Sequence, residues 1–214
     1  MLPLRLFEGA FFLGWLMSIQ ILSGLFRKTR LVVPSSARPT LIRFRQSLFD
    51  ILSGFALNSE SSGNFFKDKI VLDCFAGSGA LGIESISRGA SFAYFVDISQ
   101  VAINSIYENV QKLNLKSRCR ILKTDILKIK KFKGDNHCDI VFMDPPYGMV
   151  SIKETIKQLY TKNWISKSSF IITEEDFSRT EDLSSITNSL VERKLGNSLF
   201  RIINLKEKLP SLIK

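Results

Sequence analysis

KIVLDCFAGSGALG (residues 69–82) is a short apolar strand followed by a glycine-rich loop and the start of a helix. The strand covers 69–73, and an amphipathic pattern typical of a helix runs from 79 to 88. Glycines allow positive φ values and let a ligand approach the backbone closely. The helix start beyond them presents free N–H groups to an anion. We therefore predict a loop that binds a carboxylate or phosphate at the end of a buried strand.

Two cofactors fit this loop. Gly77 to Gly82 match the G-x-G-x-x-G pattern of dinucleotide-binding proteins, so that interpretation stays open. Asp73, four residues before the first glycine, is more typical of S-adenosylmethionine sites. A second apolar strand, at 92–96, is followed by Asp97, whose carboxylate can accept hydrogen bonds from ribose hydroxyls. Because both cofactors contain a ribose, Asp97 does not discriminate between them.

A second motif, Asp144-Pro145-Pro146-Tyr147, follows an apolar run at 140–143. The backbone must turn there, because proline lacks an N–H group and restricts the residue before it. The motif brings a carboxylate, a carbonyl and an aromatic ring to the end of a strand. These groups suit a planar base with an exocyclic amine, although the same residues also fit a plain exit from strand to loop.

Apolar strands alternate with amphipathic helices along the chain. We expect a hairpin-like arm at 19–33, helices at 42–54, 79–88, 99–114, 151–163 and 177–190, and strands at 69–73, 92–97, 119–123, 138–144, 168–174, 190–194 and 198–205. The alternation predicts an α/β fold, a single Rossmann-like doubly wound sheet, mainly parallel, with helices on both faces and a C-terminal antiparallel strand. Ligands bind beyond the carboxyl ends of such strands, where Asp73, Asp97, Asp125 and Asp144 are expected.

With these motifs the chain resembles the class I S-adenosylmethionine-dependent methyltransferases. Within that class it is similar to the RsmD-type family, the bacterial small-subunit ribosomal RNA guanine-N2 methyltransferases. The resemblance covers roughly residues 18–206 and rests on 72–84, 87–90, 144–147, Arg38-Pro39-Thr40 and 47–52. It implies an enzyme that transfers a methyl group from S-adenosylmethionine to N2 of a guanine in 16S rRNA. Cys74 departs from the larger apolar residue that is common in the family, and we expect this to affect packing only.

The resemblance also implies which residues hold the cofactor. They lie at the carboxyl ends of three strands: Asp73, Ala76, Gly77, Gly79, Asp97, Ile98, Asp125 and Ile126. The loop backbone would hold the methionine part, Asp73 its ammonium group and Asp97 the ribose. Asp125 and Ile126 would contact the adenine, although a helix N-cap is the alternative for Asp125.

By the same resemblance, the catalytic residues are Asp144, Pro145, Pro146 and Tyr147. The guanine amine is a poor nucleophile, because its lone pair is delocalised into the ring. Asp144 and the Pro145 carbonyl, both accepting from that amine, would favour a pyramidal transition state and aim the lone pair at the methyl group. Tyr147 would stack on a base extruded from its helix or loop. His137 has no nucleophile near it in the sequence, so we expect it to be solvated or structural.

The net charge of +10 and a pI near 9.6 favour a polyanionic partner. A basic group that also includes Arg45 precedes the glycine loop, and arginine suits bidentate contacts with phosphate. We predict RNA contacts for Arg27, Lys28, Arg30, Arg38 and Arg43. A lysine-rich run at 116–133 is either a second contact or a solvated face in a chain of biased composition.

A chain of 214 residues suits one enzyme domain. We divide it into an apolar extension at 1–17, an arm and helix at 18–57, and the methyltransferase domain at 65–207. The apolar stretch in 1–17 is too short to span a bilayer, and we interpret it as an extension or as a start assigned upstream of Met17. Three cysteines without metal-ligand spacing indicate reduced thiols in a cytoplasmic protein without a metal. We expect a monomer that acts on 16S rRNA or the assembling small subunit, without stable membrane association.

Other functions use parts of the same pattern. A DNA adenine-N6 methyltransferase shares the Pro-Pro motif, but it usually carries an added recognition domain. An NAD(P)-binding Rossmann protein would use the glycine loop without the Pro-Pro motif, and a small-molecule or protein methyltransferase would need no arginine arm. A protein that only binds S-adenosylmethionine would not need to keep the Pro-Pro motif. Methyl incorporation into RNA, compared with DNA, separates these functions.

Overall fold

The computed structural model describes residues 19–34, 41–57, 64–134, 136–146 and 150–206. Its helices are α1 (Leu41–Leu57), α2 (Ala80–Ser87), α3 (Gln100–Lys112) and α4 (Ile152–Thr161). Its strands are β1 (Ile19–Gln20), β2 (Arg30–Leu31), β3 (Ile70–Asp73), β4 (Phe92–Asp97), β5 (Cys119–Lys123), β6 (Cys138–Met143), β7 (Ile165–Asp176), β8 (Thr187–Leu195) and β9 (Ser198–Leu205). Short 3-10 turns occupy Lys116–Arg118, Ile126–Lys128 and Phe177–Arg179. The extension predicted at 1–17 lies outside the described residues.

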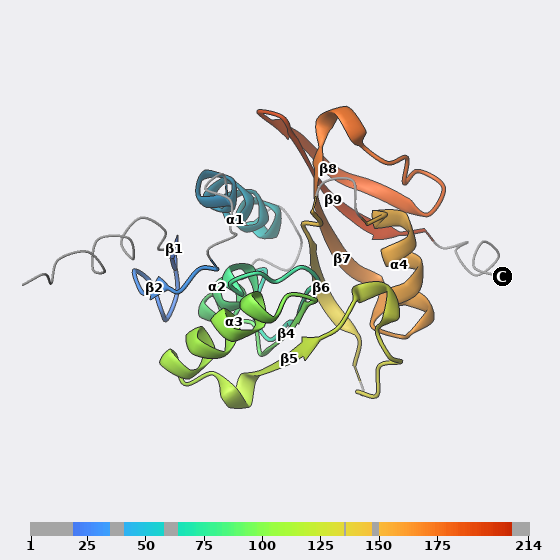
Figure 1. The fold of residues 1–214 in the computed structure, drawn as a ribbon. Coiled ribbons are helices and arrows are strands. Elements are labelled where there is room, and N and C mark those ends of the chain that lie inside the picture. Colours follow the sequence, from blue (N-terminus) through green and yellow to red (C-terminus); the bar gives the residue numbers. More distant parts are fainter. Residues whose placement is uncertain (1–18, 35–40, 58–63, 135, 147–149, 207–214) are drawn as a thin grey trace, which may run out of the picture.

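A seven-stranded sheet forms the centre of the domain, with the strand order β5-β4-β3-β6-β7-β9-β8 (Figure 1). Strands β3 to β7 run parallel, and β9 pairs antiparallel with both β7 and β8. The order reverses direction between β3 and β6, which lie side by side. Asp73, the last residue of β3, pairs in register with Phe95 of β4 and Phe142 of β6. The predicted α/β fold with antiparallel C-terminal strands is confirmed.

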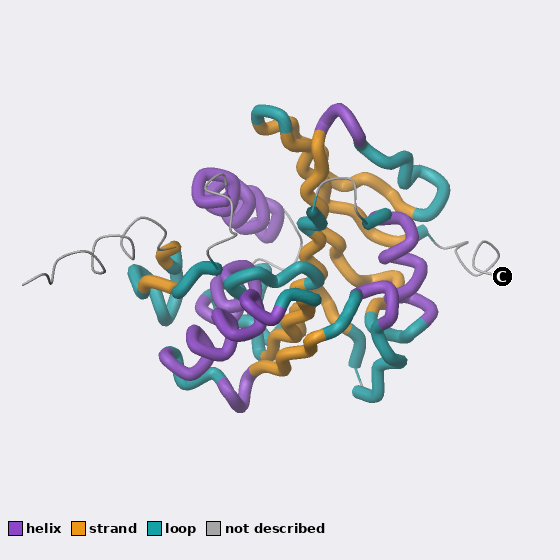
Figure 2. The backbone as a smooth tube through the Cα atoms, viewed as in Figure 1, coloured by secondary structure: helices purple, strands orange, loops and turns teal. Residues whose placement is uncertain are grey.

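Helices cover both faces of this sheet, with α1, α2 and α3 on one side and α4 on the other (Figures 1 and 2). The side chains of successive residues in β6 point to opposite faces of the sheet. The Phe142 ring packs against Phe49 of α1, with ring centroids 6.1 Å apart. Val141, its neighbour, belongs instead to the core beneath α4, together with Ile156. Each face therefore has its own apolar core, and burial of apolar area contributes about 25 cal/mol per Å² to stability.

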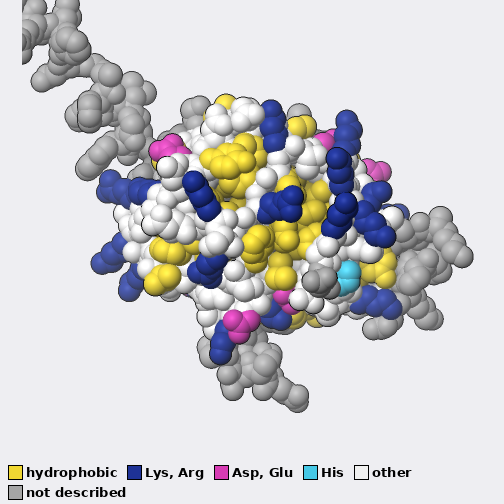
Figure 3. All heavy atoms as spheres, turned by 90° about the horizontal axis from the view of Figure 1, so that it is seen from below, with side chains coloured by type: hydrophobic (Ala, Val, Ile, Leu, Met, Phe, Trp, Pro, Cys, Tyr) yellow, Lys and Arg dark blue, Asp and Glu magenta, His cyan; other side chains and the backbone are white. Residues whose placement is uncertain are grey.

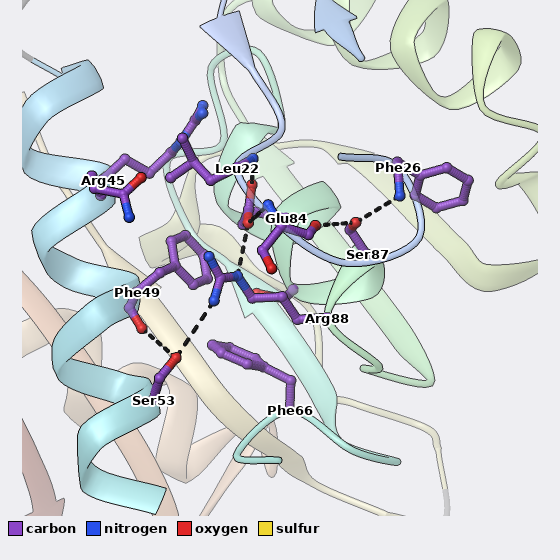
Figure 4. A network of polar contacts seen from close by, with 12 residues as sticks. Leu22, Phe26, Arg45, Phe49, Ser53, Phe66, Glu84, Ser87 and Arg88 are labelled. Carbon is purple, nitrogen blue, oxygen red and sulfur yellow. Dashed lines mark hydrogen bonds and ion pairs between the residues drawn. The ribbon is translucent and has the colours of Figure 1, made fainter. Parts of the chain in front are cut away.

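The arm at 19–34 is a two-stranded hairpin fixed to α2 (Figure 4). The buried Glu84 carboxylate accepts hydrogen bonds from Leu22 N at 2.7 Å and Ser23 N at 3.0 Å. It also pairs with Arg88 Nε at 2.7 Å. Because these contacts are largely shielded from water, they hold the arm in one position on α2. The hairpin-like arm predicted from the sequence is confirmed.

One predicted helix, at 177–190, is wrong. After a short 3-10 turn the chain forms a loop, and β8 begins at Thr187. Polar side chains in the loop bond to nearby backbone in place of helical partners, as where Asp182 accepts from Ser184 N at 2.9 Å. Glu181 accepts from the first N–H group of α4 at 2.8 Å, so it caps a different helix. The other predicted elements differ from the structure mainly at their ends.

Four further expectations concern membrane crossing, the thiols, a metal site and His137. None of the described helices is long and apolar enough to cross a membrane. All three cysteines are free thiols, as predicted. Within the described ranges, no group of His, Cys, Asp and Glu side chains could hold a metal ion. His137 is exposed, and its Nδ1 lies 2.8 Å from the Asn163 carbonyl oxygen.

Candidate active site

Four parallel strands end at one cavity of about 500 Å³. Asp73 ends β3, Asp97 ends β4, Asp125 follows β5 and Asp144 follows β6 directly. All four side chains line the cavity, which lies where the strand order reverses. The glycine loop, the start of α3, the arm and α1 supply the other walls. The sequence prediction that these carboxylates share one edge of the sheet is confirmed.

The glycine loop has a fixed shape. Gly77 and Gly79 have positive φ values of 55° and 77°, and Gly77 N donates to the Asp97 carboxylate at 2.8 Å. A Cβ atom on Gly77 would meet no described atom within 4 Å, whereas one on Gly82 would lie 2.3 Å from the Phe95 ring. Gly77 therefore leaves bare backbone beside the cavity, and Gly82 allows α2 to pack closely on β4. Gly79 precedes α2 and is not part of the cavity wall.

Asp73 is a buried carboxyl group in the cavity wall, 2% exposed. Desolvation by burial raises the pKa of Asp73 to about 7, with smaller contributions from the charges of Asp97 and Asp144. A hydrogen bond from Gly82 N at 3.2 Å opposes this shift. A cation that binds next to Asp73 would stabilise its charged form and lower its pKa.

Asp97 has both carboxylate oxygens engaged by backbone. One oxygen accepts from Gly77 N and the other from Ser99 N, each at 2.8 Å. A carboxylate oxygen has two lone pairs, so further donors can still be accepted from the cavity. Ile98, 69% exposed, lies next to it in the cavity wall and offers an apolar surface.

Asp125 is both a helix N-cap and part of the cavity wall, the two alternatives that the sequence left open. Its Oδ1 accepts from Leu127 N at 3.0 Å, which caps the 3-10 turn Ile126–Lys128. The N-cap is therefore confirmed. Asp125 and the buried Ile126 also line the cavity. Contact of these two residues with adenine stays a prediction.

The Pro-Pro motif is brought to the cavity only in part. Asp144 is half-buried and Pro146 is exposed, and both line the cavity. Pro145 is buried and lines a separate cavity of about 60 Å³ beside Glu174. Tyr147 lies outside the described residues. Of the two acceptors proposed for a base amine, the Asp144 carboxylate and the Pro145 carbonyl, the carboxylate lies in the cavity wall.

Comparison with known proteins connects this geometry to a family. Residues 19–204 match the family described as Conserved hypothetical protein 95. A protein of Buchnera aphidicola subsp. Acyrthosiphon pisum named Ribosomal RNA small subunit methyltransferase D is 36% identical over 160 residues, which cover 74% of this chain and 78% of that protein. The chain belongs to this methyltransferase family.

Other members of the family support the same assignment. An Escherichia coli K12 protein, also named Ribosomal RNA small subunit methyltransferase D, is 32% identical over 74% of this chain and 75% of its own length. The solved structure of an Escherichia coli candidate methyltransferase, yhhF, has a TM-score of 0.72 at 28% identity and covers 89% of this chain and 99% of that one. The family resemblance and the methyltransferase fold predicted from the sequence are confirmed.

The basic residues of this family member fall into two groups. Three predicted RNA contacts are exposed on the arm and lie outside the cavity wall: Arg27, Lys28 and Arg30, which we call the basic arm. Arg38 lies outside the described residues, and the side chain of Arg43 is not among those described. Arg45, in contrast, lines the cavity, although the sequence grouped it with the basic residues of the arm. Its position depends on the packing of α1, which no local sequence pattern encodes.

Proposed function

We propose that the protein transfers a methyl group from S-adenosylmethionine to the exocyclic N2 of a guanine in 16S rRNA. The observation that carries the proposal is that Asp144 and the glycine loop line one cavity. One cavity would then hold both the base amine, at Asp144, and S-adenosylmethionine, at the glycine loop. Family membership supports methyl transfer, and relatives named as small-subunit rRNA methyltransferases support the substrate.

The residues of the cavity fit the proposed cofactor. A buried carboxyl group, Asp73, suits the ammonium group of the methionine part, and the bare backbone at Gly77 leaves room for that part. Asp97 would accept from the ribose hydroxyls, with Ile98 beside it. Asp125 and Ile126 would contact the adenine. When bound, S-adenosylmethionine supplies an electrophilic methyl group on a sulfonium sulfur.

The chain's own contribution to the reaction is to orient a weak nucleophile. The Asp144 carboxylate and the Pro145 carbonyl would accept hydrogen bonds from the guanine amine, which localises its lone pair on nitrogen. The Asp144 carboxylate also stabilises the positive charge that develops on the amine, and it can hold the proton that the amine releases. Tyr147 would stack on the base, which must leave its helix or loop at a cost of a few kcal/mol.

Two basic surfaces would hold the RNA. The basic arm belongs to a hairpin that Glu84 holds on α2 through hydrogen bonds, so its charges have a defined position relative to the domain. The second surface follows β5, where a cavity of about 660 Å³ is lined by six Lys and Arg side chains. On the face seen in Figure 3, Lys and Arg side chains surround apolar ones. Cations bind the phosphates of nucleic acids, so such a surface suits RNA.

We propose that the enzyme works as a monomer on 16S rRNA or the assembling small subunit in the cytoplasm. The test is transfer of labelled methyl groups from S-adenosylmethionine to small-subunit rRNA, with DNA of matched length as the alternative substrate. Label in guanine of the RNA supports the proposal. Label in adenine of the DNA would favour the DNA adenine-N6 reaction, which uses the same motif. Asp144→Ala should abolish transfer while S-adenosylhomocysteine still binds.

A further inference from the structure

Arg45 is a buried cation with unused hydrogen-bond donors. Its side chain, on α1, is 2% exposed. Nη2 donates to the Gln20 carbonyl of the arm. Nε and Nη1 have no hydrogen-bond partner in the part of the chain that the structure describes. Buried donors on charged groups are rarely left unpaired in proteins, which indicates that a ligand supplies the acceptor.

The acid beside Arg45 does not supply that acceptor. Glu84 interacts favourably with the charge of Arg45, but neither of its oxygens accepts a hydrogen bond from Arg45 Nε or Nη1; they accept from Leu22 N, Ser23 N and Arg88 Nε (Figure 4). Burial lowers the pKa of Arg45 to about 10, an effect that Glu84 partly opposes. The guanidinium therefore stays protonated at neutral pH and remains available for an anion.

Arg45 lines the same cavity as the glycine loop and the start of α2. Ala80 and Leu81, the first two residues of α2, line this cavity together with Arg45. α2 begins after Gly79 without a side-chain cap, and the N-terminus of a helix favours negative charge. A helix start and a buried arginine are thus two separate features that attract an anion into this cavity.

We propose that Arg45 binds the α-carboxylate of the methionine part of S-adenosylmethionine, an inference that rests on the proposed function. The amino-acid end of the cofactor is a zwitterion. The cavity wall carries a buried carboxyl group, Asp73, for the ammonium and a buried guanidinium for the carboxylate. A phosphate of RNA has only negative charge and gains nothing from Asp73. A guanidinium buried to this extent also meets a ligand only through the cavity.

The test compares two ligands by titration calorimetry, S-adenosylhomocysteine and its decarboxylated analogue, which keeps the amine. Arg45→Gln should weaken binding of S-adenosylhomocysteine by about 10- to 100-fold, because a charge-assisted hydrogen bond is lost. Binding of the analogue should stay within about twofold of wild type. Arg193→Gln, on the exposed face of β8, is the matched control and should bind both ligands as wild type does.

A second variant guards against a folding defect. Arg45→Lys keeps the charge but loses the forked donors, so it should lose part of the preference for the ligand with the carboxylate. Thermal melting without ligand checks that each variant is folded. Equal weakening of both ligands, or no weakening of either, would overturn the assignment. So would a loss of RNA affinity with unchanged binding of S-adenosylhomocysteine. If wild type binds neither ligand, the proposed function itself fails, whereas wild-type binding without dependence on Arg45 overturns only this inference.

Discussion

Acidification should weaken cofactor binding, because Asp73 must be charged to hold an ammonium group. Burial raises the pKa of Asp73 to about 7, so about half of the ligand-free protein is charged there at pH 7. A bound ammonium favours the carboxylate, so binding lowers the pKa of Asp73 and releases a proton. Affinity is therefore highest where Asp73 is charged and the ligand amine is still protonated, and it falls as the pH falls below about 7.

The size of this effect follows from the pKa. At about pH 5.5 roughly 3% of Asp73 is charged, against about 50% at pH 7, so affinity should fall about 15-fold. The α-amino group of the ligand stays mostly protonated throughout this range, because its neighbouring carboxylate makes it more basic than the α-amino group of a peptide, whose pKa is about 7.7–8.0. Calorimetric titration of S-adenosylhomocysteine at both pH values gives the affinity. Buffers of different ionisation enthalpy give the number of protons released.

Asp73→Asn is the control, since it keeps the shape of the side chain and cannot titrate. Its affinity should be lower at pH 7 and nearly independent of pH. Asp97 and Asp144 are the other carboxylates whose charges act on Asp73, and they are unchanged in this variant. Wild-type affinity that is equal at both pH values would refute the reasoning, as would the same pH dependence in Asp73→Asn.

Three further changes test the site and its surroundings. Asp97→Ala should weaken S-adenosylhomocysteine binding by about 1–3 kcal/mol, because the ribose loses an acceptor, and an unchanged dissociation constant in calorimetry would contradict that role. Gly82→Ala should destabilise the protein by about 1–3 kcal/mol, since its Cβ would lie 2.3 Å from the Phe95 ring. Gly54→Ala, whose Cβ meets no described atom within 4 Å, should be neutral or stabilising, and urea midpoints that coincide for the two variants would argue against the packing role of Gly82. Replacing all three cations of the basic arm with alanine should lower RNA affinity and flatten its salt dependence with cofactor affinity unchanged, and filter binding at several salt concentrations checks this.

The sheet and its row of carboxylates could be predicted because both depend on local patterns. An apolar run that ends in aspartate recurs at Asp73, Asp97 and Asp144. Parallel strands then bring their carboxyl ends to one edge, so the shared cavity follows from the alternation of strands and helices. The structure of the segment 177–190 could not be predicted from a local pattern. Its polar side chains bond to neighbouring backbone, and β8 is stabilised by pairing with β9, which comes later in the chain.

The place of Arg45 could not be predicted for a different reason. Helical periodicity indicates only that it lies on α1. Its position beside the cavity depends on how α1 docks on α2, where the Arg88 guanidinium lies 4.7 Å from the centre of the Phe49 ring and Ser53 contacts the same arginine. These are contacts between segments far apart in sequence, and a single chain carries no local signal for them.

Nucleoside mass spectrometry of small-subunit rRNA, from cells that contain or lack the gene, is the decisive measurement. We predict that N2-methylguanosine in this rRNA falls when the gene is absent, that wild-type protein restores it, and that Asp144→Ala does not. An N2-methylguanosine content that is unchanged without the gene would contradict guanine-N2 methylation as the function. Full restoration by Asp144→Ala would contradict the cavity at the end of β6 as the place where it happens.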